Sequence, residues 1–145
     1  MSHIDNPGGP LSRTVTHEDR QGIEALFTAA ARVWRQEDMQ ELMTLYDLPI
    51  YVGTDNAAGV YHAAECDAER LRAILTATMQ AERKDVSRTE RRTPHFLSDS
   101  IAMVIVETSM SRNGDALGSC TSAILVIKKG GHWRFKGGVE AGHGK

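Results

Sequence analysis

Two titratable side chains in this 145-residue sequence could transfer protons, Asp55 and His95. A carboxylate acts as a general base near neutral pH when burial raises its pKa, and an imidazole can act there as an acid or a base. Asp55 opens the turn-forming run that ends at Gly59, where an aspartate more often hydrogen-bonds its own backbone. His95, between Pro94 and Phe96, has no carboxylate close to it in the sequence, and such a histidine is more often a surface or hydrogen-bonded core residue. The residues alone leave both roles open.

A second pair of candidates, Arg88 and Arg92, could bind an anionic ligand. They share one parity of a predicted strand with Val86 and Phe96, so both guanidinium groups face inward if Phe96 does. A guanidinium group binds a carboxylate or phosphate through two parallel hydrogen bonds. The alternative is a charged edge strand that prevents sheet-to-sheet aggregation, with Glu90 neutralising part of the charge.

Aromatic residues are a third group of candidates. Trp34 and Tyr51 occupy predicted helix and strand positions that could line a ligand pocket. Aromatic side chains at such spacing are usually part of the core. Tyr51 is the better candidate, because its hydroxyl group needs a hydrogen-bond partner if it is buried.

Composition excludes several classes of function. The 17 Lys and Arg residues against 19 Asp and Glu residues, a formal net charge of -2, provide no basic surface for nucleic acid or an anionic membrane. Cys66 and Cys120 lie far apart without metal-ligand spacing, so we expect a reduced cytoplasmic protein with no metal site. The sequence contains no apolar segment long enough to span a bilayer. Its length suits one domain.

Hydrophobic periodicity predicts three helices. The first covers residues 16–35, and a shorter one begins at Asp38 and is expected to end at Pro49, which cannot continue a helix. The third covers residues 67–83, with Ile74 in its buried stripe. Cys120, on a later strand, has no neighbouring base in the sequence, which argues against a nucleophilic thiol.

Strands are predicted between and after these helices. Residues 50–52 and 60–62 form a short hairpin, and a polar strand follows over residues 86–96. Pro94 has no backbone N–H to donate, so this polar strand belongs at a sheet edge or carries a bulge. Two hairpin dipeptides then separate three apolar runs, which predicts an antiparallel meander: residues 101–106, 123–127 and 133–139, with Asn113-Gly114 and Gly130-Gly131 between them.

The first two apolar runs are hydrophobic on both parities, so both faces of the sheet should be covered. Helices can cover one face. The other face requires a second chain or is an exposed apolar patch. We therefore expect a homodimer formed through the outer face of an α+β domain in which the helices pack on one side of an antiparallel sheet.

Three stretches accompany this order of elements: Val33-Trp34-Arg35-Gln36-Glu37-Asp38-Met39-Gln40, Leu45-Tyr46 and Gly131-His132-Trp133-Arg134-Phe135. In this order and at these positions the chain resembles the nuclear transport factor 2-like superfamily, which includes SnoaL-like polyketide cyclases, ketosteroid isomerases and the association domain of calcium/calmodulin-dependent kinases. The resemblance implies a cone-shaped α+β fold over residues 16–141, in which three N-terminal helices pack on a bent, mainly antiparallel sheet. A pocket would lie between them, and the outer face would form a dimer. Residues 1–15 and 142–145 are expected to be flexible tails.

The isomerase branch can be compared position by position. Its general base falls at Thr54, so Asp55 can replace it only if the turn has already begun, because one step along a strand reverses the face. Its two hydrogen-bond donors fall at Ala30 and at about Ala123, neither of which can donate. Removal of a single such donor typically costs about a hundredfold or more in rate, which argues against the ketosteroid isomerase mechanism.

The resemblance leaves two expectations for function. The first is a small organic molecule bound in an apolar pocket and changed by cofactor-free isomerisation, dehydration or cyclisation, with Asp55 and His95 as acid and base and Tyr51 as a donor. The second is a non-catalytic binding or dimerisation module in which Arg88 and Arg92 bind an acidic ligand.

Overall fold

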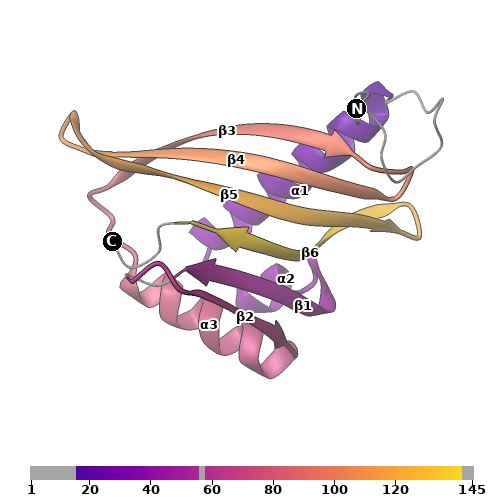
Figure 1. Ribbon diagram of the computed structural model, residues 1–145, viewed down its shortest axis with the longest axis horizontal. Helices are drawn as coiled ribbons and strands as arrows, with labels where there is room; N and C mark the ends of the chain where they lie inside the picture. The colour runs from indigo at the N-terminus through magenta and orange to yellow at the C-terminus, as the bar shows by residue number, and fades with distance from the viewer. Residues whose placement is uncertain (1–15, 56–57, 142–145) are drawn as a thin grey trace.

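The computed structural model describes residues 16–55 and 58–141, and the two expected tails lie outside that part of the chain. Figure 1 shows a single curved sheet with helices behind it and below it. The predicted order of elements is confirmed, with three helices and six strands: α1 (His17–Arg35), α2 (Met39–Met43), β1 (Tyr46–Asp55), β2 (Tyr61–Cys66), α3 (Ala68–Ala81), β3 (Ser87–Phe96), β4 (Ile101–Arg112), β5 (Asp115–Lys129) and β6 (His132–Glu140).

The predicted end of the second helix is wrong. α2 ends at Met43, and Pro49 lies inside β1, which begins at Tyr46. The register of β1 against β6 jumps from Tyr46 to Tyr51, so Pro49 lies in a stretch where β1 skips the ladder. A residue without a backbone N–H is tolerated at such an irregularity. β1 is therefore 10 residues long, where the sequence predicted a strand of three.

The sheet is mixed and mainly antiparallel, with strand order β2-β1-β6-β5-β4-β3. Only the β1–β6 pair is parallel. β3 is an edge strand, as Pro94 predicted. Both expected hairpins are present, and both central residues of each turn have positive φ angles, as two-residue hairpins require: Asn113 (51°) and Gly114 (83°), and Gly130 (57°) and Gly131 (82°).

A bulge bends β6 in its middle. Phe135 pairs with Val126, whereas Gly137 pairs with Leu125, so Lys136 is an extra residue on β6. A bulge of this kind increases the local twist and re-aims the side chains beyond it. It adjoins the irregular part of β1, so these two strands change direction together.

The two faces of the sheet differ in their neighbours. One face, here called the helix face, carries Val104, Val126 and Phe135, which form the main core with Ile23 and Leu26 of α1. α1 crosses behind the sheet in Figure 1, which shows the opposite side, here called the outer face. Full burial of one such side chain stabilises the fold by roughly 1.5–3 kcal/mol, so this layer accounts for the attachment of α1.

A smaller core lies beneath β1 and β2. It contains Met43, Ile50, Cys66 and Leu71, which joins α3 to the sheet. The predicted buried stripe of α3 is only partly correct, because Ile74 is 41% exposed. Among the described elements α3 packs mainly against α2, β1 and β2, so part of its predicted stripe is exposed.

Candidate functional site

Asp55 does not lie where the expected base should. Thr54 faces the helices, and its hydroxyl group donates a 2.8 Å hydrogen bond to the carbonyl oxygen of Glu140. Asp55 still pairs with Tyr61 in the β1–β2 ladder, so the turn has not begun and its side chain is directed to the outer face. The condition under which Asp55 could replace the base is therefore not met.

His95 also belongs to the outer face. It pairs with Met103 in the β3–β4 ladder, and its side chain is exposed. β3 and β1 are separated by three intervening strands, which places the two backbones on the order of 19 Å apart. Asp55 and His95 thus cannot act as an acid–base pair on one small molecule.

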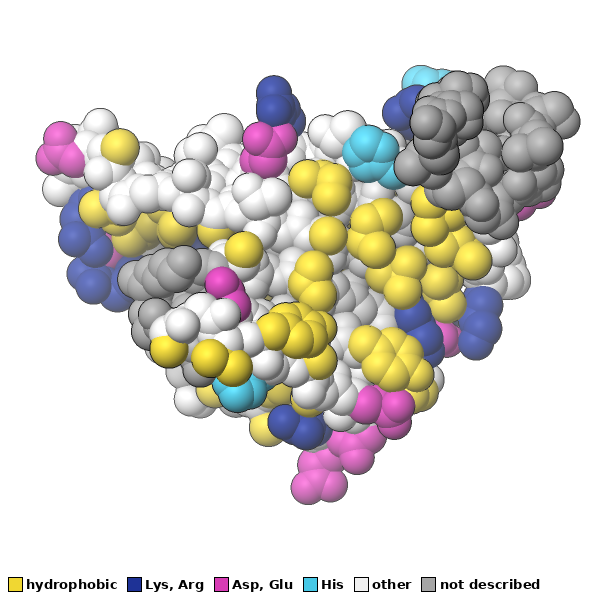
Figure 2. Space-filling view, in the orientation of Figure 1, with side chains coloured by type: hydrophobic (Ala, Val, Ile, Leu, Met, Phe, Trp, Pro, Cys, Tyr) yellow, Lys and Arg dark blue, Asp and Glu magenta, His cyan; other side chains and the backbone are white. Residues whose placement is uncertain are grey.

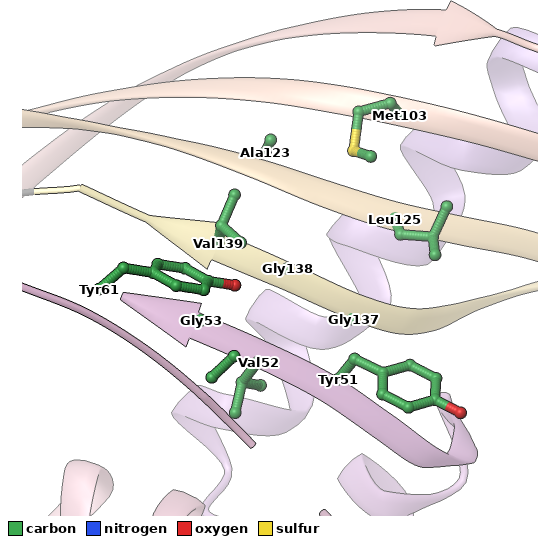
Figure 3. A pocket seen from close by; sticks show the side chains of 11 residues that line it. Tyr51, Val52, Gly53, Tyr61, Met103, Ala123, Leu125, Gly137, Gly138 and Val139 are labelled. Carbon is green, nitrogen blue, oxygen red and sulfur yellow. The ribbon is translucent and has the colours of Figure 1, made fainter. Parts of the chain in front are cut away.

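Tyr51 borders a shallow apolar groove of about 200 Å³ on the outer face. Figure 3 shows that the groove lies over β1, β6, β5 and β4, and that the ring of Tyr61, from β2, lies at one end of it beside Gly53. Three glycines line it, Gly53, Gly137 and Gly138, and a Cβ atom at Gly53 would lie 2.5 Å from the hydroxyl oxygen of Tyr61. Gly53 and Gly137 face the groove and leave it open because they carry no Cβ atom, whereas a Cβ atom at Gly138 would be directed to the helix face, against Ile124.

The two arginines face the helices, as the strand parity predicted, but their surroundings differ. Arg92 donates two hydrogen bonds to Glu24 of α1, at 3.0 and 3.1 Å, and a third to Glu90 at 2.8 Å. Its guanidinium group also lies 5.1 Å from the centre of the Phe27 ring. The hydrogen bonds from Arg92 lower the pKa of Glu24. Arg92 therefore connects α1 to the sheet edge, whereas Arg88 forms no ion pair within the described part of the chain.

Trp34 is engaged in a structural contact. Its indole Nε1 donates a 2.9 Å hydrogen bond to Glu82, the residue that follows the last turn of α3. This bond joins the ends of α1 and α3, which are 48 residues apart in the sequence.

Polar side chains from four strands gather where the helix face extends past its apolar core. We call this group the polar end; its members are Thr54, Thr108, Cys120, Ser122 and Glu140. The Cys120 thiol donates to Oε1 of Glu140 over 3.4 Å, and Thr108 is buried beside Cys120. The other four are half-buried and so remain accessible to a ligand.

The thiol of Cys120 is held protonated. Burial raises its pKa, and so do the hydrogen bond to Glu140 and the charge of that carboxylate, while a hydrogen bond from Thr108 and the charge of Arg88 oppose the shift. Glu140 is thus a base close to Cys120 in space though not in the sequence, and the thiol is still a poor nucleophile, because a nearby negative charge disfavours the thiolate.

Sequence reasoning missed Glu140. It lies in a glycine-rich ending, and its partners Cys120 and Thr54 are 20 and 86 residues away. The sequence did contain a signal for a polar site on the helix face. Thr108 and Cys120 are polar, whereas the other helix-face residues of their strands are mostly apolar.

No group of three or more His, Cys, Asp and Glu side chains in residues 16–55 and 58–141 could hold a metal ion. No helix in the same ranges is long and apolar enough to cross a membrane.

The fold of this chain matches solved structures, although no protein-family model and no curated protein matches the chain. Among these structures is an NTF2-like protein of unknown function from Pseudomonas putida KT2440, with a TM-score of 0.69, 13% identity and coverage of 88% of this chain and 89% of that one. The chain has the nuclear transport factor 2-like fold.

Two further structures extend the comparison. A ketosteroid isomerase-like protein from Erwinia carotovora atroseptica has a TM-score of 0.62 and 15% identity, and the match covers 90% of this chain and 100% of that one. A protein of unknown function with a cystatin-like fold from Nostoc punctiforme has a TM-score of 0.66 and 15% identity over 89% and 94% of the two chains. At these identities the likeness shows the fold alone.

Within this nuclear transport factor 2-like fold, the expected positions of the isomerase donors need one correction. Ala30 packs against the main core on α1. Ala123, however, lines the groove on the outer face, and its neighbour Ser122 is the residue that faces the helices. A hydroxyl group is therefore present on the helix face near the place where the second donor was sought.

Proposed function

We propose that this protein binds a small organic molecule at the polar end and catalyses cofactor-free proton transfer, with Glu140 as the general base. The observation that carries the proposal is the contact between Glu140 and Cys120 at 3.4 Å, which joins a carboxylate to a thiol whose raised pKa keeps it protonated. Thr54 fixes the backbone of Glu140 from the neighbouring strand. The carboxylate is thus held in position before a substrate arrives.

Arg88 supplies the positive charge that such a reaction requires. The charge of Arg88 acts on the thiol of Cys120, and Cys120 in turn contacts Glu140 at 3.4 Å, so the positive group and the proposed base lie on either side of the same thiol. Glu140 removes a proton from a carbon next to a carbonyl group, and the electron pair of the C–H bond moves to the oxygen. Arg88 stabilises the negative charge that develops there.

Neighbouring folds are consistent with this class of reaction, since one match is described as ketosteroid isomerase-like. The roles expected for Asp55 and His95 are not retained in the proposal, because both lie on the outer face. Arg92 is likewise replaced by Arg88, because its donors are occupied by Glu24 and Glu90.

The test uses 5-nitrobenzisoxazole, a general probe whose ring opens to a coloured phenolate when a base removes its carbon-bound proton. We expect the rate with Glu140→Gln to fall by about a hundredfold or more, the usual contribution of general base catalysis. Glu107→Gln is the matched control, because Glu107 lies on the outer face in an exposed ion pair with Arg91. Equal rates for Glu140→Gln and the unmodified protein would remove Glu140 from the mechanism.

Arg88 also supports a second candidate, a non-catalytic module for an acidic ligand. Its guanidinium group is exposed on the helix face and forms no ion pair with the described residues. Calorimetric binding of small dicarboxylates that is lost in Arg88→Gln, with no turnover of any probe, would favour this candidate over the enzyme.

We further propose that a second copy of this chain covers the outer face. Figure 2 shows hydrophobic side chains gathered across the middle strands of that face. Tyr51, Tyr61 and Val139 are 50%, 63% and 45% exposed, next to the glycine-floored groove, so the same face supplies both protruding side chains and a hollow to receive them. Six strands of about ten residues present on the order of 800 Å², which matches what each partner contributes to a stable interface.

Sedimentation tests this assembly. Leu125 lines the groove and is directed away from the core, so Leu125→Asp should give single copies at micromolar concentration without loss of helical structure. Thr28→Glu, at an exposed position of α1, is the control and should sediment like the unmodified protein. An unmodified protein that sediments only as single copies would contradict the proposal.

A further inference from the structure

A larger open pocket, here called the cavity, lies at the opposite end of the β5–β6 ladder from the polar end, between the first half of α1, the α2–β1 connection and the β5–β6 turn. Its volume is about 470 Å³, compared with about 200 Å³ for the groove on the outer face. Pockets that hold small organic ligands generally measure roughly 300–1,000 Å³. The cavity therefore has room for a compact ligand, and Ala25, Leu26 and Leu45 give it apolar walls.

The polar side chains at the opening of this cavity are mainly donors. Trp133 lies against α1 at Gly22, where a Cβ atom would be 3.0 Å from the indole Nε1. The indole N–H has no acceptor among the residues that the structure describes. Arg134 donates one hydrogen bond, 2.9 Å long, to the carbonyl oxygen of Thr44, and it forms no ion pair in the described ranges. His132 completes the opening with an exposed imidazole.

No carboxylate from residues 16–55 or 58–141 lines this cavity. Two acids on neighbouring elements are already paired: Asp19 contacts Lys128 at 3.5 Å, and Asp47 contacts Lys129 and Lys136 at 3.1 Å each. Hydrogen bonds from those two lysines lower the pKa of Asp47, so it is ionised and matched by positive charge. The guanidinium group of Arg134 thus stays outside the ion pairs that the described residues form here.

We propose that this cavity binds a small organic anion, namely a carboxylate attached to a compact apolar or aromatic body. Arg134 binds the carboxylate through its remaining donors, and the indole N–H of Trp133 donates to the same group. The apolar body lies against Ala25 and Leu26. The site is separate from the polar end and does not depend on Glu140.

The chain contains its own reporter for this site. It has two tryptophans, Trp34 and Trp133, and the indole of Trp34 is bonded to Glu82. Titration of phenylacetate into the full-length protein, followed by the two indole N–H signals in a ¹H–¹⁵N spectrum, should shift the Trp133 signal and leave the Trp34 signal in place. Phenylacetamide, which has the same shape without the charge, should bind about ten- to a hundredfold more weakly.

Two variants complete the test. Arg134→Gln should weaken phenylacetate binding by a similar factor of about ten to a hundred. Ala25→Leu should abolish it, because Ala25 is an exposed helix position where leucine fills the cavity without disturbing the core. Arg35→Gln, an exposed arginine at the end of α1, is the control and should bind like the unmodified protein. A Trp133 signal that does not move at millimolar phenylacetate, or unchanged binding by both variants, would overturn the proposal.

Discussion

Replacement of Gly137 by alanine probes the close approach of β1 and β6 that forms the floor of the outer groove. An alanine Cβ atom there would overlap the carbonyl oxygen of Tyr51 and lie 3.2 Å from its nitrogen and 3.3 Å from its carbonyl carbon. All three atoms belong to the backbone of the neighbouring strand, so no side-chain rotation relieves the contact. Overpacking of this kind costs roughly 1–3 kcal/mol.

Part of that cost is offset in the unfolded state, because alanine restricts the unfolded chain by about 0.4–1 kcal/mol relative to glycine. We therefore expect the free energy of unfolding to fall by about 1–2 kcal/mol, which lowers the melting temperature by roughly 2–8 °C for a domain of this size. Urea titrations monitored by circular dichroism give the first quantity, and calorimetry gives the second.

Gly138→Ala is the matched comparison. Its Cβ atom would meet the terminal methyl group of Ile124 at 3.1 Å and the carbonyl oxygen of Ala123 at 3.2 Å. The methyl group can rotate away, so the loss should be smaller than for Gly137→Ala. If the Gly137 variant is as stable as the unmodified protein, the two strands are not in the close contact that shapes the groove.

Three further outcomes follow from the shifted pKa values. Burial raises the pKa of Tyr46 from 10.0 to about 12, so the stability that Tyr46 contributes is intact below pH 10 and is lost as the pH rises toward 12. Urea titrations across that range should show a loss of roughly 2–3 kcal/mol in the free energy of unfolding. This loss should be absent in Tyr46→Phe. The lowered pKa of Glu24 contributes stability that is present above pH 4.5 and lost below it, so Arg92→Gln should reduce the shift of the urea midpoint between neutral and acidic solution. Iodoacetamide, followed by mass spectrometry, should modify Cys120 more slowly than a free thiol at mildly alkaline pH. Modification should be faster in Glu140→Gln, because removal of the carboxylate lowers the pKa of the thiol. Equal rates in Glu140→Gln and the unmodified protein would mean that Cys120 and Glu140 do not interact in solution.

Local signals in the sequence were sufficient for most of the fold. The hairpin dipeptides fix the β4–β5 and β5–β6 turns, since few residues other than glycine and asparagine adopt the positive φ angles found there. Pro94 predicted the edge strand correctly. β1 was predicted poorly, because its length depends on pairing with β6, whose partner residues lie more than 80 positions away. No short-range pattern around Pro49 carries that information.

The candidate site was predicted only in part, and the reason lies in strand parity. Parity alone placed Arg88 and Arg92 on the helix face, because both lie on a regular strand with Phe96 as a buried reference. The same reasoning failed for Asp55, where the outcome depended on whether the turn began one residue earlier or later. Side chains alternate between the two faces of a strand, so position in the sequence gives the face of a residue only where the strand is known to be continuous.

The parallel pairing of β1 with β6 brings the polar end together. Without it, Thr54 would belong to a hairpin with β2, and Glu140 would sit at the free edge of a four-stranded meander. With it, the hydroxyl group of Thr54 fixes the Glu140 backbone at 2.8 Å, and the Glu140 side chain meets Cys120 on the next strand. The bulge at Lys136 lies in the same strand, upstream of Glu140, so it sets the direction in which that carboxylate is presented. The irregular parallel pairing of β1 with β6 thus positions both the proposed base Glu140 and the groove on the opposite face.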